Sequence, residues 1–152
     1  MKYTEGLFMG YRHFDKNNIE PLFPFGYGMS YTSFAFNNLV IKPVITGPEV
    51  PMKISLSFNV TNVGKKDGGE VAQVYIHKLK SGLLRPVKEL KGFSKVFLRP
   101  GETKRVNILL NHDAFAYYDI EKKSWVVEPG EFEFLVGSSS RDIRLKKTFG
   151  VE

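Results

Sequence analysis

The sequence predicts an all-β domain, an antiparallel β-sandwich that follows an N-terminal arm. Three observations lead to this fold class. From residue 52 onward apolar and polar residues alternate in short runs, turn residues recur about every 8–12 positions, and no stretch has the period of a long amphipathic helix. A β-barrel is the alternative. The 152 residues suffice for one domain with a buried core.

The first half of the predicted sandwich begins with its clearest strand, residues 52–62. There Ile54, Leu56, Phe58 and Val60 alternate with Ser, Asn and Thr, as in a strand with one buried face. The glycines and the aspartate that follow indicate a turn. The next two strands read VAQVYIHK and KELKGFSKVFL, and the second contains a glycine (Gly92) that predicts a bulge.

The second half of the predicted sandwich contains shorter strands between turns. A Pro-Gly turn at 99–104 precedes KRVNILLN, whose alternate residues Val106, Ile108 and Leu110 share a face. A single helical turn then leads into a strand at 117–120. The remaining strands are WVV, FEFLVG and IRLKKTF, separated by the turns EPGE and SSSRD.

Residues 1–32 do not share the alternating pattern, and they predict an extended linker strap, here called the arm, in front of a sandwich at 33–152. The segment PLFPFGYGMSYTSF (residues 21–34) holds five aromatic rings, two prolines and two glycines. Prolines keep a chain extended and glycines permit sharp bends. So much apolar surface must be covered. We expect Phe23, Phe25, Tyr27 and Tyr31 to be buried in a groove between domains. Without that groove the arm would fold back on the sandwich, pair with another copy or stay exposed.

The composition of the chain argues against several classes of function. The chain has no cysteine, so disulfides and thiolate chemistry are absent. No apolar run approaches the roughly 20 residues of a membrane-spanning helix, and residues 1–13 lack the features of a signal peptide. The net charge of +6 is spread along the strands, with one small cluster at Lys88, Lys91, Lys95 and Arg99. We therefore expect neither a nucleic-acid nor a membrane partner, and the compartment stays open.

Several motifs carry a family resemblance. The segment EGLFMGYRHFDKNNIEPLFPFGYGMSYTSF resembles the region that leaves the catalytic domains in β-glucosidases of glycoside hydrolase family 3. Three further segments resemble the fibronectin type III-like domain at the C-terminal end of these enzymes: VTNVGKKDGGEVAQVYI, RPVKELKGFSKVFLRPGE and SWVVEPGEFEFLVGSSSRDIRL. The resemblance covers nearly the whole chain in order, and it implies an immunoglobulin-like sandwich.

The resemblance also implies that catalytic residues are absent from this chain. Members of the family hydrolyse β-glycosides with retention, with an Asp nucleophile and usually a Glu acid/base on upstream domains. The nucleophile motif Ser-Asp-Trp does not occur, and Lys123-Ser124-Trp125 carries no carboxylate. We therefore expect a non-catalytic piece of such an enzyme, without cofactor or metal, whose partners are the catalytic domains.

The residues themselves offer little for catalysis. Glu131 and Glu133 could share a strand face, but the apolar Phe132 and Phe134 oppose them, which favours a solvated outer face. Glu5 is a lone carboxylate near the start of the arm, and we expect no catalytic role for it. The histidines, His13, His77 and His112, have no spacing typical of a metal site.

Three aromatic residues are candidates for carbohydrate contact: Trp125, Tyr117 and Tyr118. Such rings could stack on a sugar, but Trp125 precedes two valines, and we favour packing in the core for it. The main hypothesis is a non-catalytic domain that packs against and stabilises catalytic domains. The alternative is a module that binds polysaccharide or self-associates. The substrate, the linkage and the oligomeric state are left open.

Overall fold

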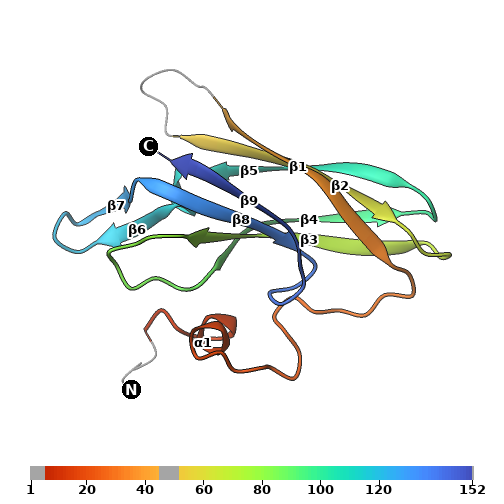
Figure 1. The fold of residues 1–152 in the computed structure, drawn as a ribbon, viewed down its shortest axis with the longest axis horizontal. Coiled ribbons are helices and arrows are strands. Elements are labelled where there is room, and N and C mark those ends of the chain that lie inside the picture. The colour runs from red at the N-terminus through yellow and green to blue at the C-terminus, as the bar shows by residue number, and fades with distance from the viewer. Residues whose placement is uncertain (1–5, 45–51, 152) are drawn as a thin grey trace.

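The computed structural model describes residues 6–44 and 52–151. Two antiparallel sheets pack face to face in it (Figure 1). One sheet has the strand order β1-β2-β5 and the other β4-β3-β8-β9, while β6 and β7 form a separate hairpin. The elements are α1 (Tyr11–Lys16), β1 (Phe34–Val44), β2 (Lys53–Asn62), β3 (Gly68–Lys78), β4 (Glu89–Leu98), β5 (Thr103–Asn111), the 3₁₀ turn η1 (His112–Ala114), β6 (Ala116–Asp119), β7 (Ser124–Val127), β8 (Gly130–Gly137) and β9 (Ile143–Val151).

The predicted β-sandwich is therefore confirmed, and the barrel alternative is wrong. Along β2, Ile54, Leu56, Phe58 and Val60 are fully buried, as the alternation predicted. The neighbouring strand β5 and the strands β3 and β8 of the facing sheet contribute their alternate residues to the same core: Val106, Ile108, Leu110, Ala72, Val74, Ile76, Phe132, Phe134 and Val136. The core therefore lies between the sheets and is made of the residues that the two-residue period marked.

The first strand, β1, was not predicted from the sequence. It pairs with β2 along its length, but the register shifts between Asn37 and Val40. Asn38 adopts a positive φ of 58° at this bulge. The one extra residue breaks the alternation of FAFNNLVIKPV, so the pattern of a strand is lost although the strand itself continues.

The bulge predicted at Gly92 is present. Val74 of β3 pairs with Gly92, and the next residue, Tyr75, pairs with Leu90, so Lys91 is the extra residue of β4. A Cβ atom at Gly92 would lie 2.8 Å from Ile108 Cγ2. Glycine is required here because the other sheet approaches the backbone closely.

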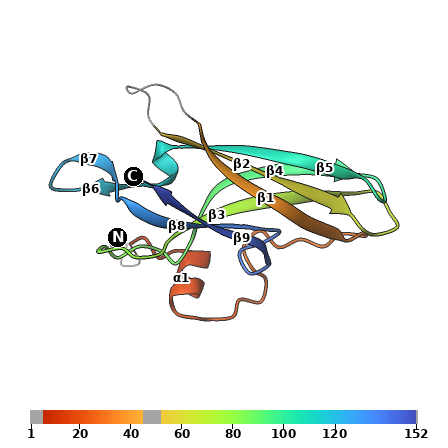
Figure 2. The ribbon, with the colours of Figure 1, turned by 45° about the horizontal axis from the view of Figure 1, so that its top comes forward.

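The arm lies beneath the outer face of the four-stranded sheet, on the side away from the core (Figures 1 and 2). The helix α1 interrupts it, so the arm is not extended throughout, and β1 begins at Phe34. Part of the expected arm, residues 1–5 with Glu5, lies outside the described residues. Among the described residues, no helix is long and apolar enough to cross a membrane.

Candidate functional site

The arm is held on the sheet by aromatic and hydrogen-bonding contacts. The Tyr11 ring stacks on Phe25 at 4.8 Å and meets Tyr75 edge to face at 5.9 Å between centroids. The backbone N–H of Leu90 donates to the Tyr11 hydroxyl at 2.9 Å. The backbone N–H of Ser140 donates to the carbonyl of Phe25 at 2.8 Å. Residues of the arm thus cover an outward-facing side chain of β3, Tyr75, which is fully buried.

A polar network continues beneath the same contact. The Tyr75 hydroxyl donates to Gln73 Oε1 at 2.6 Å, and burial raises the pKa of Tyr75 far above its usual value, so the phenol keeps its proton. The Gln73 amide donates to the carbonyls of Gly26 (3.1 Å) and Ser138 (2.7 Å). Gly26 has a φ of +79°, and a Cβ there would overlap the Gln73 amide. The chain bends at Gly26 because only glycine permits this approach.

Two cations hold one carboxylate of α1. Lys88 Nζ lies 2.6 Å from Asp15 Oδ2, and Arg141 Nε lies 3.0 Å from Asp15 Oδ1. The side chain of Asp15 is only 4% exposed, so this cluster is largely out of solvent. Lys88 is therefore not part of an exposed basic patch, although the sequence placed it in one. The connection before β4 and the turn between β8 and β9 are both tied to the arm through Asp15.

The end of the arm is fixed by a buried asparagine at the end of β2. Asn62 is fully buried and uses all its hydrogen-bonding capacity. Its Oδ1 accepts from the Thr32 hydroxyl (2.6 Å) and the Gly64 N–H (3.0 Å). Its Nδ2 donates to the carbonyls of Lys66 (2.7 Å) and Leu98 (3.0 Å). Thr32 is thus held where the arm enters the sandwich.

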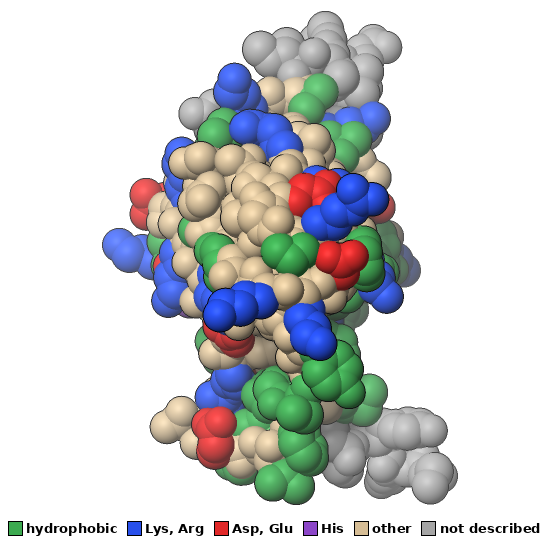
Figure 3. All heavy atoms as spheres, turned by 90° about the vertical axis from the view of Figure 1, so that its right-hand side faces the viewer, with side chains coloured by type: hydrophobic (Ala, Val, Ile, Leu, Met, Phe, Trp, Pro, Cys, Tyr) green, Lys and Arg blue, Asp and Glu red, His purple; other side chains and the backbone are tan. Residues whose placement is uncertain are grey.

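The aromatic residues that the sequence singled out in the arm do not share one environment. Phe23, Phe25 and Tyr27 are about half to two-thirds exposed, and Tyr31 is 94% exposed. Phe23 stacks on Tyr27 at 5.8 Å between centroids. Figure 3 shows hydrophobic side chains gathered at the lower end of one face, level with the arm in Figure 1. We define the arm patch as the exposed apolar side chains of Leu22, Phe23, Phe25, Tyr27, Met29 and Tyr31.

The three candidate carbohydrate contacts come together in a groove at another end of the molecule. Tyr118 pairs with Trp125 across the β6–β7 hairpin, and Tyr117 lines the same groove of about 820 Å³. Trp125 is 63% exposed, so the prediction that it packs in the core is wrong. The hairpin projects past the end of the sandwich (Figure 1): Ala116 and Val127 at its base pack on the core, whereas Trp125 lies nearer the tip.

A polar pocket of about 490 Å³ lies between the arm and the turn after β8. Burial raises the pKa of Glu70 there, against the opposing effects of the Val71 N–H and Arg144. Hydrogen bonds from Arg144 and Ser138 lower the pKa of Asp142, against a smaller effect of burial. Glu70 accepts a hydrogen bond from the Val71 N–H, and Asp142 accepts hydrogen bonds from Ser138 and Arg144. Both carboxyl groups are therefore occupied by contacts within the chain.

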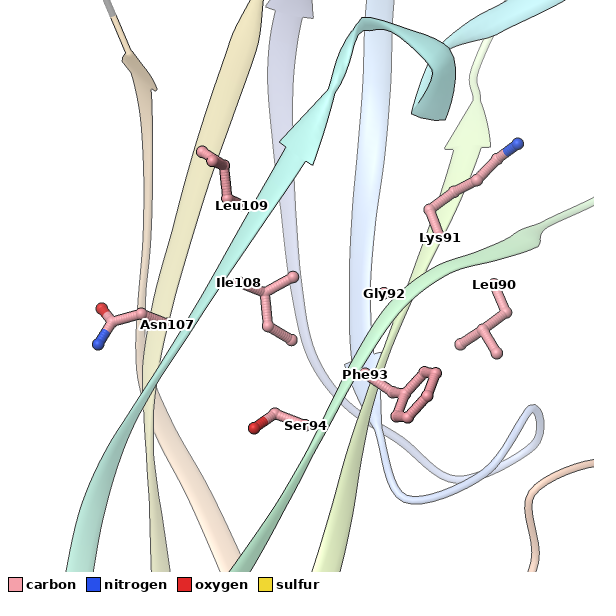
Figure 4. Close-up of a pocket in the computed structure, with 8 residues that line it drawn as sticks. All are labelled: Leu90, Lys91, Gly92, Phe93, Ser94, Asn107, Ile108 and Leu109. Atoms are coloured by element: carbon pink, nitrogen blue, oxygen red, sulfur yellow. The ribbon is translucent and has the colours of Figure 1, made fainter.

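The seam between the two sheets is open at β4 and β5. A cleft of about 550 Å³ runs along these edge strands, which approach each other closely where Ile108 points toward Gly92 (Figure 4). The polar side chains of Lys91 and Asn107 point away from each other on opposite sides of it. The cleft therefore lacks convergent polar groups that could hold a ligand.

The carboxylates and histidines considered from the sequence form no common site. Glu131 is exposed, Glu133 lies 3.6 Å from His77 Nδ1, and Phe132 and Phe134 point into the core from the opposite face. The histidines lie on α1, β3 and η1. Within residues 6–44 and 52–151, no group of three His, Asp or Glu residues could hold a metal ion.

Comparison with known proteins agrees with this fold. A family model described as a fibronectin type III-like domain matches residues 70–140. Thermostable beta-glucosidase B of Acetivibrio thermocellus is 50% identical over 152 residues, which cover 99% of this chain and 20% of that protein. Beta-glucosidase BoGH3A of Bacteroides ovatus is 43% identical over 150 residues, covering 97% of this chain and 20% of that protein.

Solved structures give the same result. The crystal structure of beta-D-glucoside glucohydrolase from Trichoderma reesei matches with a TM-score of 0.91 and 36% identity, over 98% of this chain and 23% of that one. Beta-glucosidase from Kluyveromyces marxianus, solved in complex with glucose, matches with a TM-score of 0.88 and 46% identity. This match covers 99% of this chain and 18% of that one. The chain thus spans about a fifth of the length of these relatives. The chain is similar to the C-terminal part of these β-glucosidases of glycoside hydrolase family 3, and residues 70–140 match a fibronectin type III-like domain.

Proposed function

We propose that the arm patch docks this region onto the catalytic domains of a family 3 β-glucosidase, an enzyme that hydrolyses β-glucosides with retention. The region would stabilise the arrangement of those domains and take no part in the chemistry. One observation carries this proposal: the apolar side chains between Leu22 and Tyr31 stay exposed although the backbone that bears them is fixed to the sandwich.

The fixed backbone favours docking to a preformed surface. The arm is held at Asp15, Gly26 and Thr32, on both sides of and within the exposed segment. Little further ordering is therefore needed when the rings are buried, and the cost of binding falls accordingly. Complete burial of one large apolar side chain contributes about 1.5–3 kcal/mol, so even part of this patch suffices for a stable intramolecular interface.

A chimeric enzyme tests the docking function. The matching fifth of the Acetivibrio thermocellus relative would be replaced by this chain, and the melting temperature and the hydrolysis of an aryl β-glucoside would be measured. We expect Phe23→Ser with Tyr31→Ser to lower the melting temperature of the chimera by several degrees. In the isolated chain the same pair should change it little, because both rings are already exposed.

The control is Leu109→Ser, which also replaces an exposed apolar residue but lies on β5, in the other sheet. It should leave the melting temperatures of the chimera and of the isolated chain unchanged. An equal effect of the arm variant on the isolated chain and on the chimera would contradict docking. Self-association through the same rings is the competing outcome, and light scattering over a concentration series would reveal it as a dimer that the arm variant abolishes.

A further inference from the structure

The groove beside the β6–β7 hairpin has the size of a ligand site. Its volume of about 820 Å³ is within the range of roughly 300–1,000 Å³ that is usual for small-molecule sites. The hairpin forms one wall, the connection between β3 and β4 another, and the start of the arm with α1 the third. Figures 1 and 2 place the hairpin at one end of the sandwich, whereas the arm after α1 runs toward the other end.

The hairpin presents an aromatic surface to this groove. Tyr118 and Trp125 face each other across β6 and β7, with centroids 5.7 Å apart and planes at 74°. This edge-to-face contact holds the two rings together, yet Trp125 stays 63% and Tyr118 50% exposed. An exposed, flat and ordered indole ring is suited to stacking on the apolar face of a pyranose.

Hydrogen-bonding groups from α1 and β4 also line the groove. Arg12 Nη2 is 3.0 Å from Glu89 Oε1, and Lys91 Nζ is 3.6 Å from Glu89 Oε2. The three side chains are fixed by one another and all line the groove. Together they offer both donors and acceptors, as a polyhydroxylated ligand requires.

The charges of the groove argue against a polyanion as its ligand. Three basic residues line it, Arg12, Arg85 and Lys91, and three acidic ones, Glu89, Asp119 and Glu121. This balance gives no preference for a polyanion such as a nucleic acid or an acidic sugar.

We propose that this groove binds a β-linked gluco-oligosaccharide, with Trp125 stacked on one glucose ring and with Arg12, Glu89 and Lys91 bonded to hydroxyl groups. The choice of β-linked glucose rests on the proposed function, because the parent would act on β-glucosides. The groove would hold a glucan chain near the enzyme and leave the docking surface on the arm free.

Trp125 is the only tryptophan of the chain, so its fluorescence reports on the groove directly. Purified chain would be titrated with cellohexaose and with laminarihexaose, and maltohexaose would serve as the α-linked control. We expect a saturable change in Trp125 emission with at least one β-linked hexasaccharide and a smaller or no change with maltohexaose. No saturable change with either β-linked ligand at millimolar concentration would overturn the proposal.

Retardation in gels that contain a soluble mixed-linkage β-glucan gives a second readout, since Trp125→Ala removes the fluorophore. We expect Trp125→Ala to weaken binding at least about tenfold. Phe93→Ala is the matched control, because Phe93 is similarly exposed but lies on β4, outside this groove. Unchanged retardation of Trp125→Ala, or equal losses in both variants, would refute the site.

The chimera separates this proposal from docking. If the groove is free for a glucan, Trp125→Ala should leave the melting temperature of the chimera unchanged while Phe23→Ser with Tyr31→Ser lowers it. If Trp125→Ala lowers the melting temperature of the chimera but not that of the isolated chain, the groove belongs to the interdomain interface. That result would overturn glucan binding. Glucan binding by the isolated chain is measured without catalytic domains, so it can succeed where docking fails.

Discussion

Asp15 and Lys88 are separated by 73 positions in the sequence and form a 2.6 Å ion pair that is almost closed to solvent. Arg141 completes the contact from the turn between β8 and β9. One carboxylate of a six-residue helix thereby joins two distant connections of the sandwich. The position of the arm thus depends on a few residues that lie far apart in the chain.

Replacement of Asp15 by alanine should destabilise the fold strongly. It would leave Lys88 without its counter-charge in a poorly solvated site and would remove one of the two carboxylates beside Arg141, at a cost of about 3–5 kcal/mol. Urea unfolding measures this cost, and limited proteolysis should show faster cleavage within residues 6–33. Asp113→Ala is the control, because Asp113 is 90% exposed beside His112 and should cost well under about 1 kcal/mol. Equal costs for the two variants would contradict a structural role of the pair.

Replacement of Asn62 by alanine should also be costly. The change removes four hydrogen bonds at once and leaves the carbonyl of Leu98 without a partner in the interior. We expect a loss of roughly 2–4 kcal/mol in the free energy of unfolding. Hydrogen exchange should in addition show weaker protection of the Gly64 amide. Asn107→Ala, on the exposed side of β5, should change neither quantity.

Replacement of Gly92 by alanine tests the bulge in β4. The new methyl group would lie 2.8 Å from Ile108 Cγ2 and 3.2 Å from Leu110 Cδ2, both of which belong to the core. Overpacking of this kind costs about 1–3 kcal/mol. Thermal unfolding provides the measurement. Gly82→Ala is a matched control, since a Cβ at Gly82 meets nothing within 4 Å, and a similar loss there would exclude the steric explanation.

The stability contributed by Asp142 should depend on pH. Its carboxylate accepts hydrogen bonds from Arg144 and from the Ser138 hydroxyl, and these lower its folded pKa below the ordinary value of 3.8. Folding therefore favours the ionised form, so this stabilisation is present above about pH 4 and is lost as the pH falls through the lowered folded pKa.

We expect Asp142→Asn to be less stable than the parent at pH 7 and to approach it near the acid limit, as measured by urea unfolding across pH. Arg144→Met should give the same pH profile, because it removes the largest cause of the shift. A destabilisation by Asp142→Asn that is constant with pH would show that the ionised form of Asp142 is not what matters.

The sandwich could be predicted from local pattern, whereas its fine structure could not. The alternation at Ile54–Val60 marks a buried face wherever the strand lies. In β1 the bulge at Asn38 breaks the same signal, and no window of sequence restores it. Trp125 was misplaced because alternation reveals which face a residue occupies, but not how far its hairpin extends beyond the core.

The residues that attach the arm to the sandwich could not be predicted from the sequence for a related reason. Lys88 is part of a run that resembles a solvated basic cluster, and its partner Asp15 lies in another part of the chain. The contact of Tyr11 with Tyr75 is likewise long-range. The sequence identified the arm through its rings, but the residues that fasten it, Asp15, Gln73 and Asn62, carry no local signal.

The burial of Tyr75 under the arm bears on how such a module can be moved between proteins. If recombination cut the gene at the start of β1, the transferred sandwich would lack the arm. Gln73 and Tyr75 would then be exposed on the outer face of the sheet. A transfer that began before α1 would bring its own cover. The unit that can be transferred intact is therefore the arm together with the sandwich.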